Sequence, residues 1–266
     1  MSLSGRTRAQ DVLRVMLPLV GFILVVALWQ AVVTGFRLPA ILLPSPGAAF
    51  ASGVANAHKL IEASLATAAR VGLGFVAGVL VAVPLAVLTV QYPFAGQIVQ
   101  PLITLSQAVP KVALAPLVVV WFGHGYPSQT AFAALVGFFP IFIETLLGLQ
   151  AMEAEMLLLA RSMGSTPAQL FLKFRFPRAL PHIFAGLKVG ATLAVVGATV
   201  AEWIGGETGI ALVLLRADSL LDTPLAVAAL LVLALMGIAF YSLISLIEVW
   251  ITPGWARRRQ FKTTTT

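Results

Sequence analysis

Cysteine is absent from the 266 residues of this chain, and charged residues are scarce at 10%. Without cysteine the chain forms no disulfide, thiolate zinc site or iron–sulfur cluster, and it has no cysteine nucleophile. Soluble domains average about 25% charged and about 45–50% apolar residues, whereas 59% of these residues are apolar. The composition therefore excludes an ordinary water-soluble enzyme, a disordered chain and a disulfide-stapled secreted module, and it indicates an integral membrane protein.

Long uncharged runs account for the apolar excess. A bilayer core about 30 Å thick is crossed by roughly 20 apolar residues in a helix. Three runs have this length without a charge, 15–36, 71–90 and 224–247. Three more are interrupted but long enough, 94–122, 127–143 and 183–204. Barrel strands would alternate polar and apolar residues, which these runs do not. We therefore predict an all-α integral membrane fold with six transmembrane helices.

The first run needs to be distinguished from a cleaved signal peptide. It is longer than the roughly 7–15 apolar residues of a signal core, and no small-x-small cleavage site follows it, so we expect an uncleaved anchor helix. The expected parts of the chain are a cytoplasmic N-terminus (1–14), the anchor helix (15–36), an extracytoplasmic loop (37–63), a core of five spans (64–250) and a basic cytoplasmic tail (251–266).

Basic residues are distributed unequally between the two sides that six spans imply. One side holds both termini, the turn near residue 92 and segment 150–182, with 11 Lys and Arg residues. The other side holds loops 37–63 and 205–223 and turn 123–126, with 3. Because basic residues collect in cytoplasmic loops, we expect both termini and segment 150–182 in the cytoplasm. The net charge of +7 then needs no nucleic-acid partner.

Segment 150–182 is the longest predicted cytoplasmic insertion. Four apolar residues in its first half share one helical face: Met152, Met156, Leu159 and Met163. Gly164 is expected to end that helix, because glycine adopts the left-handed conformation found after helix ends. Thr166 followed three residues later by Gln169 fits a capping box, which starts a second helix.

The second helix of this segment is expected to carry Phe171 and Phe174 on one face and to end at Pro177 and Pro181. An aromatic face on a basic background suits docking into a groove of a partner protein. It equally suits a helix lying on the inner leaflet. The residues alone leave these two alternatives open.

Few ionisable residues fall within the predicted spans: Arg70, Lys111, Glu144, Lys188 and Glu202. Such groups are costly in a bilayer and usually functional. Arg70, Glu144 and Lys188 lie near span ends, where snorkelling to the interface is the simpler explanation. Glu202 lies near the exterior end of its span and is a pathway candidate, with a role in helix packing or gating, and plain surface exposure is the alternative.

Lys111 lies deeper, beside Pro110 in a helix interrupted by two prolines. A proline frees backbone groups that must face protein or water. We therefore expect Lys111 and Pro110 to be candidates for lining a solute pathway, where Lys111 would favour anions. A structural ion pair or a contact with backbone carbonyls is the alternative for this lysine.

Small residues recur every fourth position on two spans. Gly74, Gly78 and Ala82 follow this spacing on one span, and Gly186 and Gly190 follow it on another. This spacing allows helix backbones to approach closely. We expect helix packing at these positions, with pore lining as the alternative.

The sequence offers little chemistry of its own. No Gly-Lys dipeptide occurs, so a Walker A phosphate loop is excluded from this chain. The three histidines, His58, His124 and His182, are expected in three different loops, so we expect no metal site. Two rival classes of protein are a polytopic membrane enzyme and an ion-coupled carrier. Either of them would need clustered titratable groups.

The segment around Gly164 resembles the cytoplasmic "EAA" loop of ABC importer permeases. The family pattern has Glu-Ala-Ala, three residues, glycine, nine residues, isoleucine, one residue, then Leu-Pro. Here Ala160, Gly164 and Pro177 keep their places, and Phe174 and Phe176 replace the isoleucine and leucine. Leucines occupy the first two positions of the pattern.

The resemblance covers roughly residues 40–258 and extends to the nitrate/sulfonate/taurine branch of that family. Five further stretches carry it: Pro44-Ser45-Pro46, Ser64 to Gly78, Val109-Pro110-Lys111-Val112-Ala113-Leu114-Ala115-Pro116-Leu117, Trp121-Phe122-Gly123-His124-Gly125, and Val200-Ala201-Glu202-Trp203-Ile204-Gly205. The resemblance implies a type I importer fold in a bacterial inner membrane. It also implies a permease subunit without its own ATPase site or cofactor.

What the resemblance implies about partners is equally specific. Two cytoplasmic ATPase subunits would bind ATP and Mg²⁺, an extracytoplasmic binding protein would deliver the solute, and a second permease copy would complete a homodimer in the bilayer. The solute would be a small anion such as a sulfonate, taurine or nitrate, or alternatively a small heterocyclic vitamin precursor. The expected ATPase-coupling residues are Ala160, Arg161, Gly164, Ser165, Thr166, Gln169, Phe171, Phe174 and Pro177.

Overall fold

A computed structural model describes residues 4–106, 108–152 and 154–252. Within these ranges every regular element is helical, which confirms the predicted all-α fold. The described chain divides into two compact units. One contains the residues up to Leu60 together with Val213–Leu231, and the other contains Ile61–Leu212 and the chain from Val232 onward.

The first unit is built on α1 (Ser4–Gly35) and α2 (Pro46–Ala55). The Ser45 side chain accepts a hydrogen bond from the Ala48 N–H at 3.2 Å, and Pro46 follows the cap, so α2 starts where its sequence dictates. The Trp29 Nε1–H donates to the Pro44 carbonyl at 3.0 Å. This bond holds the connection between the two helices against α1. Residues 37–63, expected as an exterior loop, thus contain α2 and the start of the next helix.

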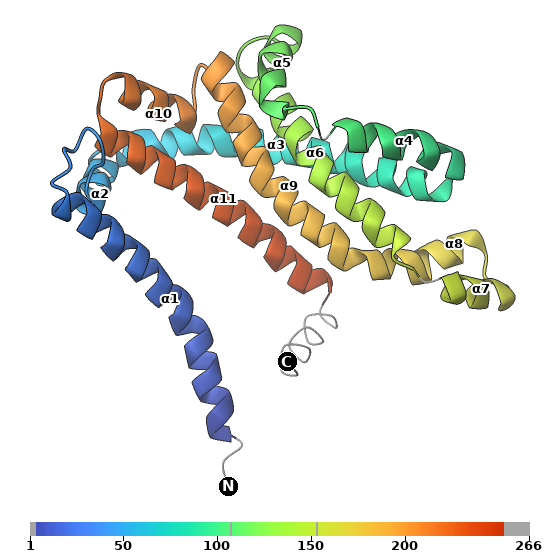
Figure 1. Cartoon of the computed structure of the whole chain (residues 1–266). Coiled ribbons are helices and arrows are strands. Elements are labelled where there is room, and N and C mark those ends of the chain that lie inside the picture. Colours follow the sequence, from blue (N-terminus) through green and yellow to red (C-terminus); the bar gives the residue numbers. More distant parts are fainter. Residues whose placement is uncertain (1–3, 107, 153, 253–266) are drawn as a thin grey trace. The chain divides into compact units, whose positions relative to one another are not determined.

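Of the remaining helices, labelled in Figure 1, those from α4 to α9 lie in the second unit, and α3, α10 and α11 are each divided between the two units. In chain order they are α3 (Ala57–Gln91), α4 (Pro93–Ser106), the 3₁₀ turn η1 (Lys111–Leu114), α5 (Ala115–Phe122), α6 (Tyr126–Gln150), α7 (Ala154–Ser162), α8 (Pro167–Leu170), the π-helical turn η2 (Phe171–Arg175), α9 (Phe176–Gly205), α10 (Ile210–Ser219) and α11 (Thr223–Ile251).

Helices α6 and α9 run side by side through the second unit (Figure 1). A Cβ atom added to Gly190 would lie 3.0 Å from the Gly137 carbonyl oxygen, and one added to Gly137 would lie 3.0 Å from the Gly190 oxygen. At Gly186 the Pro140 carbonyl oxygen would also lie 3.0 Å away. The two backbones therefore approach so closely that only glycine fits between them.

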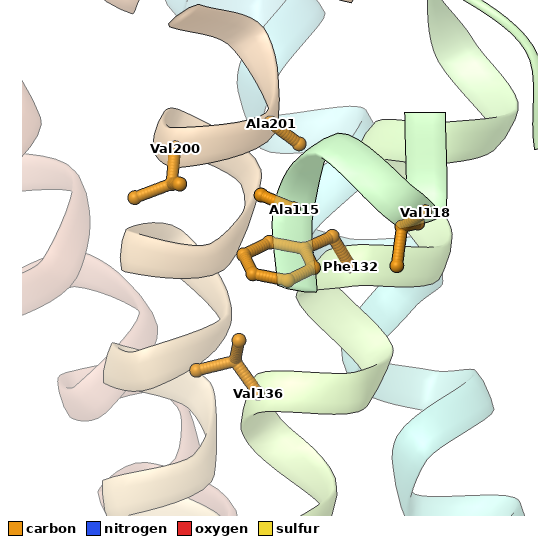
Figure 2. Close-up of a cluster of buried hydrophobic side chains, with 6 residues drawn as sticks. All are labelled: Ala115, Val118, Phe132, Val136, Val200 and Ala201. Carbon is orange, nitrogen blue, oxygen red and sulfur yellow. The ribbon is translucent and has the colours of Figure 1, made fainter. Parts of the chain in front are cut away.

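A cluster of buried apolar side chains joins α5 to this helix pair (Figure 2). Phe132 of α6 is 1% exposed and lies at its centre. The other members are Ala115, Val118, Val136, Val200 and Ala201. Burial of an aromatic ring of this size stabilises by about 1.5–3 kcal/mol in water. In a bilayer the gain comes instead from close van der Waals packing.

Four predicted spans correspond to helices that are long and apolar enough to cross a membrane. These are α3, α6, the continuous helix Pro167–Gly205 and α11. The predicted run 94–122 is instead two helical pieces that meet at 94°, either a broken span or a re-entrant loop. In α1 the apolar stretch found is Leu19–Gly35, shorter than a span. The count of six therefore stays a prediction.

Two local expectations were wrong. Pro177 and Pro181 do not end the helix that starts at Pro167, because the chain continues as one helix of 39 residues to Gly205. The π-helical turn η2 precedes Pro177, and the Phe176 N–H bonds to the Phe171 carbonyl five residues back. Such a wide turn makes room for a residue that lacks an N–H. His182 consequently lies in α9 and not in a loop.

Candidate functional site

Glu202, near the C-terminal end of α9, lies at the centre of a buried polar cluster. Its side chain has no exposed surface. Oε1 accepts hydrogen bonds from the Thr67 hydroxyl at 2.6 Å and from Arg70 Nη1 at 3.0 Å. Oε2 accepts from the Ala211 N–H at 3.1 Å. Plain surface exposure of Glu202 is therefore wrong, and so is snorkelling of Arg70, which is 6% exposed.

The loop after α9 closes around this ion pair. Arg70 Nη1 donates to the Thr208 carbonyl at 2.7 Å, and Arg70 Nη2 donates to the Thr208 hydroxyl at 2.5 Å. The Ile210 N–H donates to Thr67 Oγ1 at 3.0 Å. Gly209 has a φ of +133°, and a Cβ there would collide with the carboxyl group of Glu202. The residues Thr67, Arg70, Glu202, Thr208 and Ala211 are called the Glu202 cluster below.

The Glu202 cluster connects three helices through one carboxylate. Thr67 and Arg70 belong to α3, Glu202 belongs to α9, and Ala211 is in the first turn of α10. The carboxylate thereby binds a free N–H group at the start of α10, where negative charge is favourable. A buried charge pair is tolerated when further hydrogen bonds satisfy it. The arrangement therefore holds helices together, and both carboxylate oxygens are occupied.

Two further acidic side chains, Glu248 and Glu144, pair with basic residues of α9. Lys188 in α9 pairs with Glu248 in α11, with both side chains largely buried. Snorkelling of Lys188 into solvent is therefore wrong. Glu144 in α6 faces His182 in α9, with 3.3 Å between Oε2 and Nδ1 and both side chains partly exposed. These contacts join α9 to its two neighbours.

Lys111 is in a different environment. It starts the 3₁₀ turn after Pro110, is half-buried, and its Nζ lies 4.7 Å from the centre of the Phe139 ring. None of the three ion pairs found among the described residues includes Lys111. A cation over an aromatic face keeps its charge available to a further partner. Pro110 itself is exposed.

The first helix of segment 150–182 ends at a glycine, as predicted. α7 ends at Ser162, and Gly164 follows with a φ of +80°. The Ser165 N–H donates to the Ala160 carbonyl at 3.2 Å. This is the 6→1 bond of a Schellman motif. The glycine stop is confirmed, whereas the side chain of Arg161 lies outside the described residues.

The predicted capping box is also confirmed. The Thr166 side chain accepts from the Gln169 N–H at 3.2 Å, and the Gln169 side chain accepts from the Thr166 N–H at 3.0 Å. Phe171 and Phe174 follow in η2, and Pro177 lies in the first turn of α9. Among the described side chains of this segment several large apolar ones are exposed: Met156, Leu158, Met163, Leu172 and Phe174.

The sequence did not identify the partners of Glu202. Arg70 and Glu202 are 132 positions apart, and a single sequence carries no signal of that pairing. The only local hint was the glycine-rich stretch after the carboxylate, Gly205, Gly206 and Gly209, which a close backbone approach would require. Among the described residues no group of three His, Asp or Glu side chains could hold a metal ion.

Comparison with known proteins gives a consistent set of matches. The family described as "Binding-protein-dependent transport system inner membrane component" matches residues 74–257. The riboflavin transport system permease protein RibX of Chloroflexus aurantiacus is 34% identical over 236 residues, covering 86% of each chain. The formylaminopyrimidine transport permease protein ThiX of Halalkalibacterium halodurans is 31% identical over 243 residues, covering 91% of this chain and 96% of its own. The taurine transport system permease protein TauC of Escherichia coli is 28% identical over 216 residues, covering 79% and 78%.

Proposed function

Because the chain belongs to the family of binding-protein-dependent transport system inner membrane components, a family of ABC importer permeases and not of enzymes, we propose that it forms the pathway for a small anion. The solute is a sulfonate, taurine or nitrate, and in taurine, a zwitterion at neutral pH, the sulfonate is the group that carries the negative charge. The observation that carries this choice is Lys111, a half-buried cation without an ion-pair partner among the described residues. A lone cation beside a proline break attracts anions and repels cations.

A second candidate solute is a small heterocyclic vitamin precursor. It is favoured by the names of two relatives, a riboflavin and a formylaminopyrimidine transport permease, at 34% and 31% identity. The positive charge of Lys111 attracts an uncharged heterocycle only weakly. Uptake of a heterocycle should therefore depend less on Lys111 than uptake of an anion does.

Uptake by the Lys111→Met variant distinguishes the two solutes. Radiolabelled taurine and riboflavin are offered to cells that express the chain with its ATPase and binding-protein partners. We expect taurine uptake to fall at least about tenfold, the effect of a lost hydrogen bond to a charged group. The Lys59→Met variant, altered at an exposed lysine of α3, serves as the control. Unchanged taurine uptake at equal protein levels would contradict the anion pathway.

The energy comes from partners. A dimer of cytoplasmic ATPase subunits binds ATP and Mg²⁺, an extracytoplasmic binding protein delivers the solute, and a second copy of the chain completes the pathway. The absence of a Gly-Lys dipeptide supports a separate ATPase. The exposed apolar side chains between Met156 and Phe174 support docking of that ATPase on segment 150–182.

Cysteine cross-linking tests the docking site, and the chain has no native cysteine to interfere. Ser165→Cys and Gln169→Cys lie on either side of the capping-box threonine and are expected to cross-link to the ATPase subunit. Glu207→Cys, exposed in the loop after α9, is the control and should not. A transport-competent complex without any cross-link at either position would contradict the coupling role.

The same variants test the topology. The distribution of basic residues, 11 against 3, supports a multi-pass protein of the bacterial inner membrane with both termini in the cytoplasm. A membrane-impermeant maleimide added to intact spheroplasts should label Glu207→Cys and should not label Ser165→Cys until the membrane is opened. The reverse pattern would invert the orientation.

The Glu202 cluster serves the pathway indirectly. Both carboxylate oxygens of Glu202 are hydrogen-bonded within the protein, so the group holds α3, α9 and α10 in place and does not bind solute. Gly74, Gly78, Gly186 and Gly190 have the same role of holding helices at close distance. Of the three pathway candidates in the sequence, Lys111 and Pro110 remain.

A further inference from the structure

A cleft of about 840 Å³ opens in the second unit where α3 and α6 end. Small-molecule sites in proteins occupy roughly 300–1,000 Å³. Its wall is formed by the last turns of α3 and α6, by one face of α4, and by the turn η2. The residues that line it include Thr89, Gln97, Gln100, Thr104, Gln150 and Arg175.

Among the described residues, Arg175 is the only charged one that lines this cleft. It also lines a smaller cleft of about 280 Å³ beneath α8, so its side chain lies between the two. The side chain is half-buried and its Nε atom is buried without a hydrogen-bond partner. None of the three ion pairs among the described residues includes Arg175. Its positive charge therefore has no ion-pair partner in the part of the chain that the structure describes, and it lies in a concave surface.

The remaining polar groups of the cleft are suited to an acceptor. The hydroxyls of Thr89 and Thr104 already donate to the backbone carbonyls of Leu85 and Gln100, at 2.7 Å and 2.9 Å. The free donors are then the guanidinium of Arg175 and the side-chain amides of three glutamines. No carboxylate is present among the described residues that line the cleft. A cation surrounded by amide donors is the composition of an oxyanion site.

We infer that this cleft binds one small oxyanion group, a sulfonate, phosphate or carboxylate, with Arg175 as its charged ligand. The planar guanidinium can bind two oxygens of such a group at once. The alternative, in which Arg175 only neutralises the carbonyl ends of α3 and α6, is disfavoured because no hydrogen bond to these carbonyls is formed. An oxyanion here would connect α4 with η2 and so with segment 150–182.

The oxyanion has two possible sources. With segment 150–182 in the cytoplasm, as the proposed function has it, the cleft faces either free cytoplasmic anions or the headgroups of the inner leaflet. The chemistry of recognition is the same for both. A binding measurement without ATP or binding protein separates this inference from the transport function, because it would succeed even if the solute were assigned wrongly.

The experiment measures binding of radiolabelled sulfate to the full chain, in complex with its ATPase and held in nanodiscs of neutral phosphatidylcholine. We expect saturable binding of one sulfate per chain. In the Arg175→Gln variant the affinity should fall at least about tenfold, because a charged hydrogen-bond donor is lost, and Arg175→Lys should restore part of it. Lys173→Gln, altered at an exposed lysine of the same turn, is the matched control and should bind as the unmodified chain does.

A second arm tests the lipid source. If a headgroup enters the cleft, phosphatidylglycerol in the nanodisc should compete with sulfate for binding. Native mass spectrometry should then find phosphatidylglycerol bound to the unmodified chain and absent from the Arg175→Gln variant. Competition identifies the lipid as the source of the oxyanion, and sulfate binding that ignores the lipid identifies a free anion. Sulfate and phosphatidylglycerol both failing to bind, or binding equally to Arg175→Gln and Lys173→Gln, would overturn the inference. Since Arg175→Gln could lose its fold, the Gln100→Leu variant provides a second test, with weaker binding expected at an unchanged unfolding temperature.

Discussion

The two ends of the helix Pro167–Gly205 are built in opposite ways. At its C-terminal end Glu202 is completely buried, and both of its carboxylate oxygens are hydrogen-bonded to α3 and α10. At its N-terminal end Leu172 and Phe174 are exposed, and Arg175 has no ion-pair partner among the described residues. At the C-terminal end, called the closed end below, the polar groups of Glu202 are hydrogen-bonded within the chain. The N-terminal end, called the open end below, exposes apolar side chains and contains the cation of Arg175. The first is suited to holding a fixed arrangement and the second to binding partners.

The largest effect is expected at the closed end. Glu202→Ala leaves the guanidinium of Arg70 buried and unpaired, and it also removes the acceptor for the first turn of α10. Breaking one partner of a buried ion pair costs about 3–5 kcal/mol. We therefore expect a loss of that size in the free energy of unfolding, measured by denaturant titration in detergent micelles.

The double variant Glu202→Ala with Arg70→Met controls for this interpretation. It removes both charges, so its cost should be smaller than the sum of the two single costs. Additive costs would mean that the two side chains act independently, and the Glu202 cluster would then not be a cooperative unit.

A smaller effect is expected from Gly74, one turn along α3 from Arg70. A Cβ at this position would lie 2.6 Å from the Thr130 carbonyl oxygen of α6, whereas nothing lies within 4 Å of a Cβ at Gly72. Gly74→Ala should therefore destabilise by about 1–3 kcal/mol through overpacking. Gly72→Ala should stabilise by up to about 1 kcal/mol, because alanine favours the helix. Thermal unfolding of both variants in the same detergent measures the contrast, and equal shifts would contradict close packing of α3 on α6.

The smallest effect on overall stability is expected at the open end. Thr166→Ala removes the hydroxyl that caps α8 and costs about 1 kcal/mol locally. Because segment 150–182 makes few buried contacts, we expect faster hydrogen exchange of the Gln169 and Leu170 amides with little change in the unfolding temperature. Taurine uptake should fall, although the unfolding temperature changes little. If Thr166→Ala lowered the unfolding temperature as much as Glu202→Ala, the contrast between the two ends would be wrong.

Local features of this fold could be predicted from the sequence, and distant ones could not. Four of the predicted spans are visible as long apolar runs, and the stop at Gly164 and the capping box from Thr166 to Gln169 depend on residues within a single turn. The pairing of Arg70 with Glu202 depends on a contact across 132 positions. α10 was taken for loop because it is only ten residues long and carries no span-like run.

Proline gave the clearest wrong expectation, for a physical reason. A proline in a helix removes one hydrogen bond and displaces the carbonyl four residues earlier. The rule for helix termination follows from that cost in a regular α-helix. Here η2 changes the hydrogen bonding just ahead of Pro177, so the cost is avoided at that proline, and Pro181 lies inside the continuing helix. The sequence of η2, Phe-Leu-Lys-Phe-Arg, gives no sign of the wider turn.

The π-helical turn η2 also determines the rotation of the residues before it relative to the residues after it. A π-helical turn holds one residue more than an α-helical turn, and each residue of an α-helix advances about 100° around the axis and about 1.5 Å along it. The extra residue in Phe171–Arg175 therefore determines how far α8 is rotated about the helix axis relative to α9. Deleting a single residue there would leave the span, the charge pattern and the capping box nearly unchanged. It would nevertheless turn the outward face of the open end by more than a quarter of a circle.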